Sequence, residues 1–185
     1  MRKNFGAKPW VYPQPVFIIA SYDENGNANA MNAAWGGISC DTEICLCIAD
    51  EHKSTKNILA RKAFTVSMAT LPQIAACDYV GLVSGNDVPD KVARAGFHVA
   101  KSELVDAPII EELPMTLECR LISYEPETCH LFGEIVNISA DESILTNGKI
   151  DISKLCPLTL DPVNHTYHVV GEKVGTAFNA GASLK

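Results

Sequence analysis

The pattern of apolar and polar residues along the chain predicts a protein built mainly of strands. A compact apolar run over residues 16–22 predicts a buried strand, and residues 23–26 after it contain the hairpin-turn pair Asn-Gly. We therefore expect residues 16–35 to form a β-hairpin. Further strands are predicted over residues 44–49, 64–68, 115–124, 131–138 and 166–170.

The strand over residues 115–124 alternates regularly enough to assign its two faces. Side chains at successive strand positions point to opposite sides of a sheet. We expect the apolar set to face inward and the polar set to face outward. The inward set is Met115, Leu117, Cys119 and Leu121, and the outward set is Thr116, Glu118 and Arg120.

Helical signals are confined to the middle of the chain. Ser54 is predicted to open a short helix that ends near Lys62, and Pro72 precedes helix-compatible spacing over residues 74–83. A second short helix is expected over residues 90–95, because Gly96 stops it. About seven strands with a helical insertion predict a mainly β fold, a β-barrel core with helices packed outside, in a single domain over residues 1–185.

The second strand of the predicted hairpin has very little side-chain bulk. Residues 27–37 read NANAMNAAWGG, whereas strands usually favour β-branched and aromatic residues. On a strand, one face carries Asn29, Met31, Ala33 and Trp35, and the other carries Ala30, Asn32 and Ala34. Small side chains would let a flat ligand lie against the backbone. Close packing against another strand or subunit would require the same residues.

Composition and charge exclude several classes of function. The 185 residues are 47% hydrophobic and 20% charged, which is typical of a globular chain. The net charge is −7 and no block of Lys and Arg occurs, which argues against nucleic acid or a membrane surface as the main partner. Apolar runs are too short to span a membrane, and no apolar core follows Arg2 and Lys3, so we expect a cytoplasmic protein without a secretory signal.

The seven cysteines and five histidines show no metal-binding pattern. No C-x-x-C occurs, and we expect reduced thiols, most of them small buried hydrophobic residues. Cys45 and Cys47 would share one face of a strand. His165 and His168 form H-x-x-H, but their rings would face opposite sides if this segment is a strand, so no metal site is expected.

One segment has the features of an anion site. EHKSTKNIL, residues 51–59, places Ser54 at a predicted N-cap, with Thr55, Lys56 and Asn57 in the first helical turn. Free backbone N–H groups, hydroxyls and the lysines Lys53 and Lys56 would then converge, which is how phosphate is held at a helix N-terminus. An ordinary helix cap with solvated lysines remains the alternative.

Four segments in a fixed order resemble the flavin reductase-like proteins, in particular the flavoredoxin-like subgroup. They are residues 12–40, HKSTKNI at 52–58, DYVGLVSGNDVPDK at 78–91 and HLFGEIV at 130–136. The resemblance implies an FMN-binding split β-barrel that is usually a homodimer. One departure is the segment Asp41-Thr-Glu43, where the family often has a Pro-Pro pair.

The resemblance also implies a set of cofactor-binding residues, with no catalytic acid or base. Along the isoalloxazine, mostly through backbone, it places Asn29, Ala30, Met31, Asn32 and Ala33, with Trp35 close by. Around the phosphate it places His52, Lys53, Ser54, Thr55 and Asn57. The S-G…D-K segment near the flavin contributes Ser84, Gly85, Asp90 and Lys91.

The expected function is transfer of reducing equivalents by bound FMN, whose chemistry the protein positions and tunes. Either an NAD(P)H-dependent reductase or an electron carrier that accepts electrons from a redox partner protein fits the residues. The missing G-x-G-x-x-G motif does not exclude NAD(P)H, since this family binds nicotinamide on the flavin face. Two other possibilities are a flavin-binding module or sensor without turnover, and a split barrel that binds another planar cofactor such as haem or pyridoxal phosphate.

Overall fold

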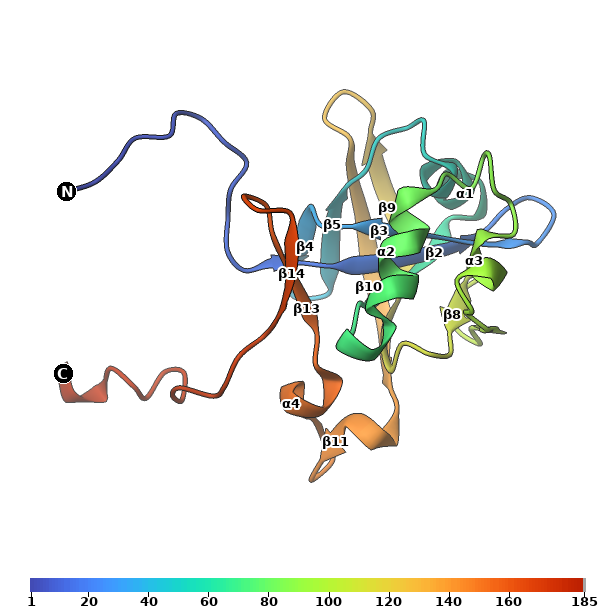
Figure 1. Cartoon of the computed structure of the whole chain (residues 1–185). Helices are drawn as coiled ribbons and strands as arrows, with labels where there is room; N and C mark the ends of the chain where they lie inside the picture. The colour runs from blue at the N-terminus through green and yellow to red at the C-terminus, as the bar shows by residue number, and fades with distance from the viewer. Residues whose placement is uncertain (185) are drawn as a thin grey trace.

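The computed structural model describes residues 1–184. Its main element is a seven-stranded antiparallel sheet, most of whose strands are labelled in Figure 1. In spatial order the strands run β3-β2-β6-β9-β10-β5-β4. Their bounds are β2 Phe17–Tyr22, β3 Ala28–Ala33, β4 Gly36–Cys40, β5 Glu43–Cys47, β6 Ala63–Met68, β9 Met115–Glu125 and β10 His130–Ala140.

The sheet curls into a half-barrel because consecutive strands lie at its two edges. Only Ala34 and Trp35 separate β3 from β4, yet these strands are the first and last of the sheet. The backbone N–H of Cys47 donates to the carbonyl of Trp35 at 2.8 Å, which holds this connection against β5. The edges of the sheet are thereby brought close together.

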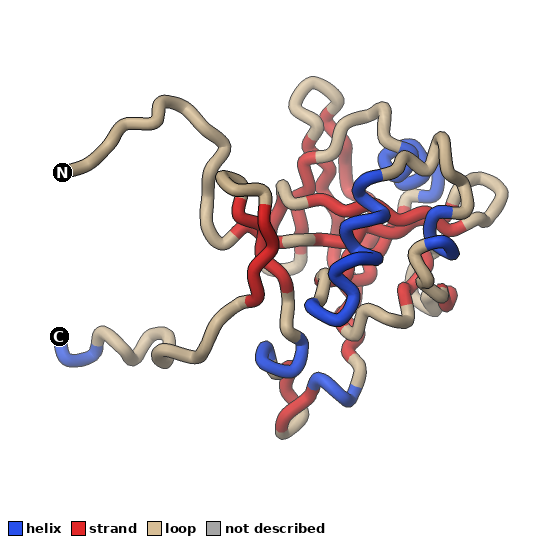
Figure 2. Tube along the Cα trace, in the orientation of Figure 1, coloured by secondary structure: helices blue, strands red, loops and turns tan. Residues whose placement is uncertain are grey.

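Smaller elements complete the fold, and Figure 2 shows the helices on the outside of the strands. The three-stranded sheet β1-β13-β14 comprises Gln14–Pro15, Leu158–Asp161 and Thr166–Val169. Two short hairpins are β7 Val99–Lys101 with β8 Pro108–Ile110, and β11 Leu145–Thr146 with β12 Lys149–Ile150. The α-helices are α1 Lys53–Arg61, α2 Ile74–Leu82, α3 Lys91–Arg94 and α4 Ile152–Leu155, and short 3₁₀ turns cover Leu71–Gln73, Glu142–Ile144 and Ala182–Leu184.

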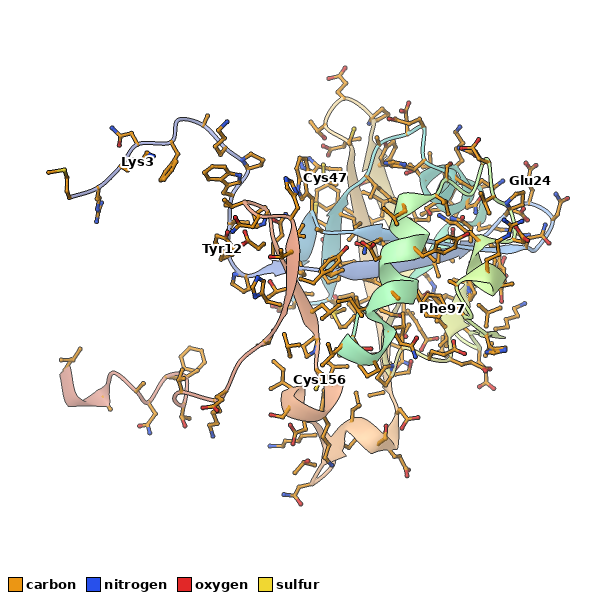
Figure 3. The ribbon with its side chains drawn as sticks, viewed as in Figure 1. Lys3, Tyr12, Glu24, Cys47, Phe97 and Cys156 are labelled. Carbon is orange, nitrogen blue, oxygen red and sulfur yellow. The ribbon has the colours of Figure 1, made fainter. Side chains whose placement is uncertain are left out.

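Two layers of apolar side chains cover opposite faces of the sheet. Inside the curl, Phe17 and Ile19 of β2 pack in one cluster with Ile58 of α1. On the outer face, Ile18 packs in a second cluster with Val80 of α2 and with Phe97, which is labelled in Figure 3. Because β2 is covered on both faces, its sequence is a continuous apolar run rather than an alternating one.

Several sequence predictions are confirmed. β2 and β3 form the expected hairpin, in which Tyr22 pairs with Ala28 and Gly26 adopts φ +83° in the turn. The predicted helices correspond to α1, α2 and α3, and Gly96 follows α3 at φ +80°. The additional strands β1, β4, β7, β8, β11, β12 and β13 were not predicted, because two to five residues carry too little periodicity.

The two faces predicted for β9 are confirmed, because Met115, Leu117, Cys119 and Leu121 pack inside the curl. Thr116 and Glu118 lie on the opposite face, but that face is not open to solvent there. Both side chains are buried, because β9 is covered on both faces. The Thr116 hydroxyl lies 2.8 Å from the Ser67 hydroxyl. The Glu118 carboxylate accepts hydrogen bonds from Asn137 Nδ2 at 2.6 Å and from the Ser102 hydroxyl, which satisfies its buried oxygens.

The prediction that most cysteines are buried is wrong. Only Cys77 and Cys119 are buried, and burial raises their thiol pKa values to about 11 and about 12. Cys45 and Cys47 lie on one face of β5 as expected, but both are half-buried. The other half-buried and exposed thiols are those of Cys40, Cys129 and Cys156, and all seven cysteines are free.

The two terminal segments extend away from the body on the same side (Figure 1). Residues 1–13 and 171–182 are exposed throughout. The N-terminal segment is held against the body near its end by Tyr12, which is labelled in Figure 3. The Tyr12 hydroxyl donates a hydrogen bond to the Asp161 carboxylate of β13. Within residues 1–184, the helices are all too short or too polar to cross a membrane.

Candidate functional site

A cavity of about 320 Å³ lies where β3, the start of α1 and the end of α2 meet. We call it the edge cavity. Its volume is within the range typical of small-molecule sites. Its walls are formed by Asn29, Met31, Asn32, His52, Lys53, Ser54, Val80, Gly81, Leu82, Val83, Ser84, Gly85 and Lys91.

The cavity follows the outer edge of β3. Asn29 faces α1, to which it is hydrogen-bonded, whereas Asn32 faces α2 on the opposite side of the sheet. Both nevertheless line the same cavity. A single space can reach both faces only around the edge of the strand, and in the seven-stranded sheet β3 pairs with β2 alone. The backbone groups on its other side therefore face the cavity.

Helix α1 starts earlier than predicted, because its N-cap lies two residues before Ser54. His52, in extended conformation, is the N-cap, so Ser54 lies inside the first turn and the prediction of Ser54 as the cap is wrong. Lys56 N donates to His52 O at 3.2 Å. The N–H groups of Lys53, Ser54 and Thr55 precede this bond and have no intrahelical acceptor. They carry the partial positive charge of a helix N-terminus, a favourable position for an anion.

The side chains of this first turn separate into two groups. Ser54 lines the cavity and accepts a hydrogen bond from Asn29 Nδ2 at 2.7 Å. Thr55 is fully buried, and its hydroxyl donates to Ala49 O at 2.7 Å, away from the cavity. Asn57 is also buried outside the cavity lining, and its Nδ2 has no hydrogen-bond partner in the described part of the chain. Lys56 is exposed and does not line the cavity.

Two glycines allow α2 and its following loop to approach β3 closely. A Cβ at Gly81 would lie 2.8 Å from the Cβ of Asn32, and a Cβ at Gly85 would lie 2.1 Å from Oδ1 of Asn29. Real Cβ contacts are not this short. Each asparagine therefore has a glycine opposite it, and the Asn29–Gly85 contact is the tighter.

The cavity wall is positively charged. Lys53 lines it, with its Nζ 3.9 Å from Asp23 Oδ2. The Lys91 Nζ, almost fully buried, donates to Val80 O at 2.9 Å and Val83 O at 2.8 Å, and thereby caps the end of α2. Burial lowers the pKa of Lys91 to about 8. The lining residues include no Asp or Glu.

Six of the residues predicted from the resemblance lie outside the edge cavity: Ala30, Ala33, Trp35, Thr55, Asn57 and Asp90. Ala30 packs beneath α2 and Ala33 against the cluster inside the curl, so close packing accounts for these two small residues. Asp90 is exposed and pairs with Arg94 at 2.9 Å. The rest of the predicted set does line the cavity.

Trp35 lines a separate cavity of about 580 Å³, together with Trp10 of the N-terminal segment. We call it the arm cavity. It is bounded by residues 8–11 and 13–15 on one side and by 34–36 on the other. The arm cavity therefore begins where β3 ends, two residues beyond Asn32.

Sequence reasoning missed the contribution of Val80, Gly81, Leu82 and Val83 to the edge cavity. The available signal was Gly81, because a glycine within a helix is costly and often marks a close approach. The periodicity of the segment gave no sign that this end of α2 would lie against β3.

Comparisons with known proteins identify a family and similar structures. The protein-family model of the flavin reductase like domain matches residues 10–162 of the sequence. Flavoredoxin of Desulfovibrio vulgaris (Miyazaki F) is 37% identical, with a TM-score of 0.94 over 98% of this chain and 100% of that chain. Flavoredoxin from Methanosarcina acetivorans is 28% identical, with a TM-score of 0.90 over the whole of both chains.

A relative without an assigned function also matches. The uncharacterized protein YddH of Escherichia coli K12 is 30% identical over 145 residues, which span 73% of this chain and 75% of that protein. The expected fold class, a split β-barrel with helices outside, is confirmed by the curled sheet and these structural matches. Because the domain match extends over most of the sequence, this chain belongs to the flavin reductase-like family.

Proposed function

We propose that this chain binds FMN in the edge cavity and transfers reducing equivalents through it. One observation carries the proposal. In a chain of net charge −7, this cavity has a helix N-terminus, Lys53 and Lys91 in its wall and no carboxylate. That donor set fits a ligand with an anionic phosphate, and the family membership and the flavoredoxin matches support a flavin. When bound, FMN supplies the electron-transfer chemistry.

The two ends of the cavity suit the two parts of FMN. The phosphate would be held at the start of α1, by Ser54, Lys53, His52 and the free N–H groups of the first turn. From there β3 runs from Asn29 to Asn32, about 10 Å at 3.3 Å per residue. The ring system would lie along this edge, where Met31, Val80 and Leu82 exclude water and backbone groups bind its polar rim.

Lys91 would keep a positive charge beside the cavity. Its ammonium is held by the carbonyls of Val80 and Val83, so its position is fixed by α2 rather than by the ligand. A fixed cation stabilises negative charge that develops nearby and needs no reorganisation when that charge appears. We infer that Lys91 favours a reduced, anionic flavin over the neutral oxidised form.

We propose NAD(P)H as the electron donor, so that the chain is an NAD(P)H-dependent FMN oxidoreductase. Membership of a flavin reductase-like family supports this assignment. The experiment is to purify the protein, record its visible spectrum, and add NADH or NADPH without oxygen. A yellow protein that bleaches is a reductase. A yellow protein that bleaches only with dithionite or a redox partner protein is an electron carrier. A colourless protein that takes up no added FMN would contradict flavin binding itself.

We further propose that the single domain, residues 1–185, works as a homodimer in the cytoplasm. Apolar side chains that a monomer leaves exposed support the dimer, and they gather on the N-terminal segment, around β4 and on the C-terminal segment. They include Phe5, Val11, Tyr12, Trp35, Ile38, Val174 and Phe178. Seven free thiols fit a reducing compartment.

Sedimentation of the holoprotein tests the dimer. Two chains of 20.0 kDa should sediment together at micromolar concentration. A variant without residues 1–13 should shift toward the monomer, because this segment contributes exposed apolar surface. A single 20.0 kDa species with full flavin occupancy would contradict the dimer.

A further inference from the structure

The side chain of Asn32 is held in one orientation from outside the edge cavity. Its Nδ2 donates to Cys77 O, in α2, at 3.1 Å and to the Tyr167 hydroxyl at 3.4 Å. A backbone carbonyl can only accept, so the atom facing Cys77 must be the amide nitrogen. The amide therefore cannot be flipped without losing a hydrogen bond.

This orientation leaves Asn32 Oδ1 available to a ligand. No donor among residues 1–184 reaches this oxygen, and it is not among the buried polar atoms without a partner. Asn32 lines the edge cavity and its oxygen is neither paired nor buried, so the amide can offer this acceptor to a ligand in the cavity. A carbonyl oxygen in such a position binds a ligand N–H or O–H.

The residue that supports Asn32 lies outside the residues that the family model matches. Tyr167 lies on β14, beyond the matched residues 10–162. Its hydroxyl donates to Asp78 Oδ1 at 2.7 Å, which leaves its oxygen lone pairs to accept from Asn32. Burial, reinforced by Asp78, raises the pKa of Tyr167 to about 12, so the hydroxyl keeps its proton and this arrangement at neutral pH.

We propose that Asn32 reads the ring of the bound flavin through Oδ1, and that Tyr167 is the positioning residue that fixes Asn32. Oxidised isoalloxazine carries a single N–H group, at N3, so N3–H is the donor that Oδ1 selects. This inference rests on the proposed function, because it concerns the same cavity. It adds that ring recognition is by a side chain oriented from α2 and β14.

The test compares FMN with FMN methylated at N3. The probe keeps the phosphate and the ring but lacks the N–H donor. We expect the apoprotein to bind FMN at least tenfold more tightly than 3-methyl-FMN, because the analogue leaves the Asn32 oxygen unpaired. Flavin fluorescence quenching gives both dissociation constants without any measurement of activity.

Matched variants separate lost hydrogen bonding from simple crowding. Asn32→Leu keeps the shape of the side chain but removes the acceptor, so the preference for FMN should fall to less than threefold. Asn29→Leu alters the other amide of β3, at the phosphate end, and should weaken both ligands while it preserves their ratio. Tyr167→Phe should lower the ratio partway, with intact circular dichroism.

The outcomes distinguish the inference from the proposed function. Equal affinities of the wild-type protein for FMN and 3-methyl-FMN would overturn the inference and leave FMN binding standing. An unchanged ratio in Asn32→Leu would show that the methyl group is rejected by crowding, and would overturn it as well. If Tyr167→Phe kept the wild-type preference for FMN over 3-methyl-FMN, Tyr167 would not be the residue that positions Asn32. Failure to bind either ligand would overturn the proposed function and this inference with it.

Discussion

Asn29 and Asn32 are both asparagines of β3, three positions apart, but their side chains bond to different elements. Asn29 donates to a side chain of α1, the hydroxyl of Ser54, at 2.7 Å. Asn32 donates to the backbone of α2 at 3.1 Å. Asn29 is buried, whereas Asn32 is half-buried. An odd separation on a strand sends two side chains to opposite faces, so each amide meets a different helix.

The comparison shows that different helices form the two ends of the edge cavity. At the Asn29 end, Ser54 and Lys53 belong to α1, and Gly85 closes over the amide. At the Asn32 end, Gly81 and the carbonyl of Cys77 belong to α2. A helix N-terminus favours negative charge, whereas an amide oxygen selects a donor. The two ends can therefore be disrupted independently.

The largest effect is expected from closing the Asn29 end. In Gly85→Val, the new side chain would overlap Asn29 Oδ1, since even a Cβ would lie 2.1 Å away. Asn29 would have to give up its buried bond to Ser54. We expect at least a hundredfold loss of FMN affinity and a loss of about 1–3 kcal/mol in the free energy of unfolding.

Gly81→Ala is the matched change at the Asn32 end and should be milder. Its Cβ would lie 2.8 Å from the Asn32 Cβ, and alanine favours the helix by about 1 kcal/mol over glycine. Titration with FMN and unfolding in urea measure both variants. A Gly85→Val protein that retains wild-type affinity would contradict the placement of the cavity.

An intermediate effect is expected at the proposed phosphate position. Ser54→Ala removes a hydroxyl that lines the cavity, and we expect FMN to bind about tenfold more weakly, while riboflavin, which lacks the phosphate, changes little. Thr55→Ala is the control, because the Thr55 hydroxyl bonds Ala49 O instead. It should lower stability by about 1 kcal/mol and leave the FMN-to-riboflavin ratio unchanged. Equal losses of both ligands in Ser54→Ala would place the phosphate elsewhere.

The smallest effect concerns Lys91, which α2 holds beside the cavity. Its pKa is about 8 in the folded chain and 10.5 in the ordinary case, so above pH 8 the unfolded state binds more protons. The contribution of Lys91 to the free energy of unfolding should then rise with pH, by about 1 kcal/mol between pH 7.5 and 9.

Lys91→Met should lack this contribution, so the free energy of unfolding of wild type minus that of the variant should rise by about 1 kcal/mol between the two pH values. The buried thiols of Cys77 and Cys119 act in the opposite direction, because their raised pKa values reduce stability as pH increases. Guanidinium unfolding of wild type and Lys91→Met at the two pH values gives the comparison. Parallel pH profiles would mean that Lys91 titrates at its ordinary pKa in the folded chain.

The sequence by itself determined the elements that depend on neighbouring residues. The hairpin of β2 and β3 follows from an apolar run, an Asn-Gly turn and a strand with little bulk, all within twenty residues. The start of α1 was identifiable to within two residues, since charged and capping residues act locally. The resemblance then assigned a ligand class to that turn, and most of the predicted residues do line one cavity.

Only the tertiary structure decided which predicted residues share that cavity and what each one does. Local pattern assigned Thr116 and Glu118 to the outer face of β9, but it cannot show that this face is covered and that both side chains are buried. It cannot show that Thr55 faces Ala49 while its neighbour Ser54 faces the cavity. The role of Asn32 depends on Cys77 and Tyr167, which are 45 and 135 residues away in sequence. Such contacts arise because burial and hydrogen bonding are satisfied between elements that only folding brings together, and no sequence periodicity records them.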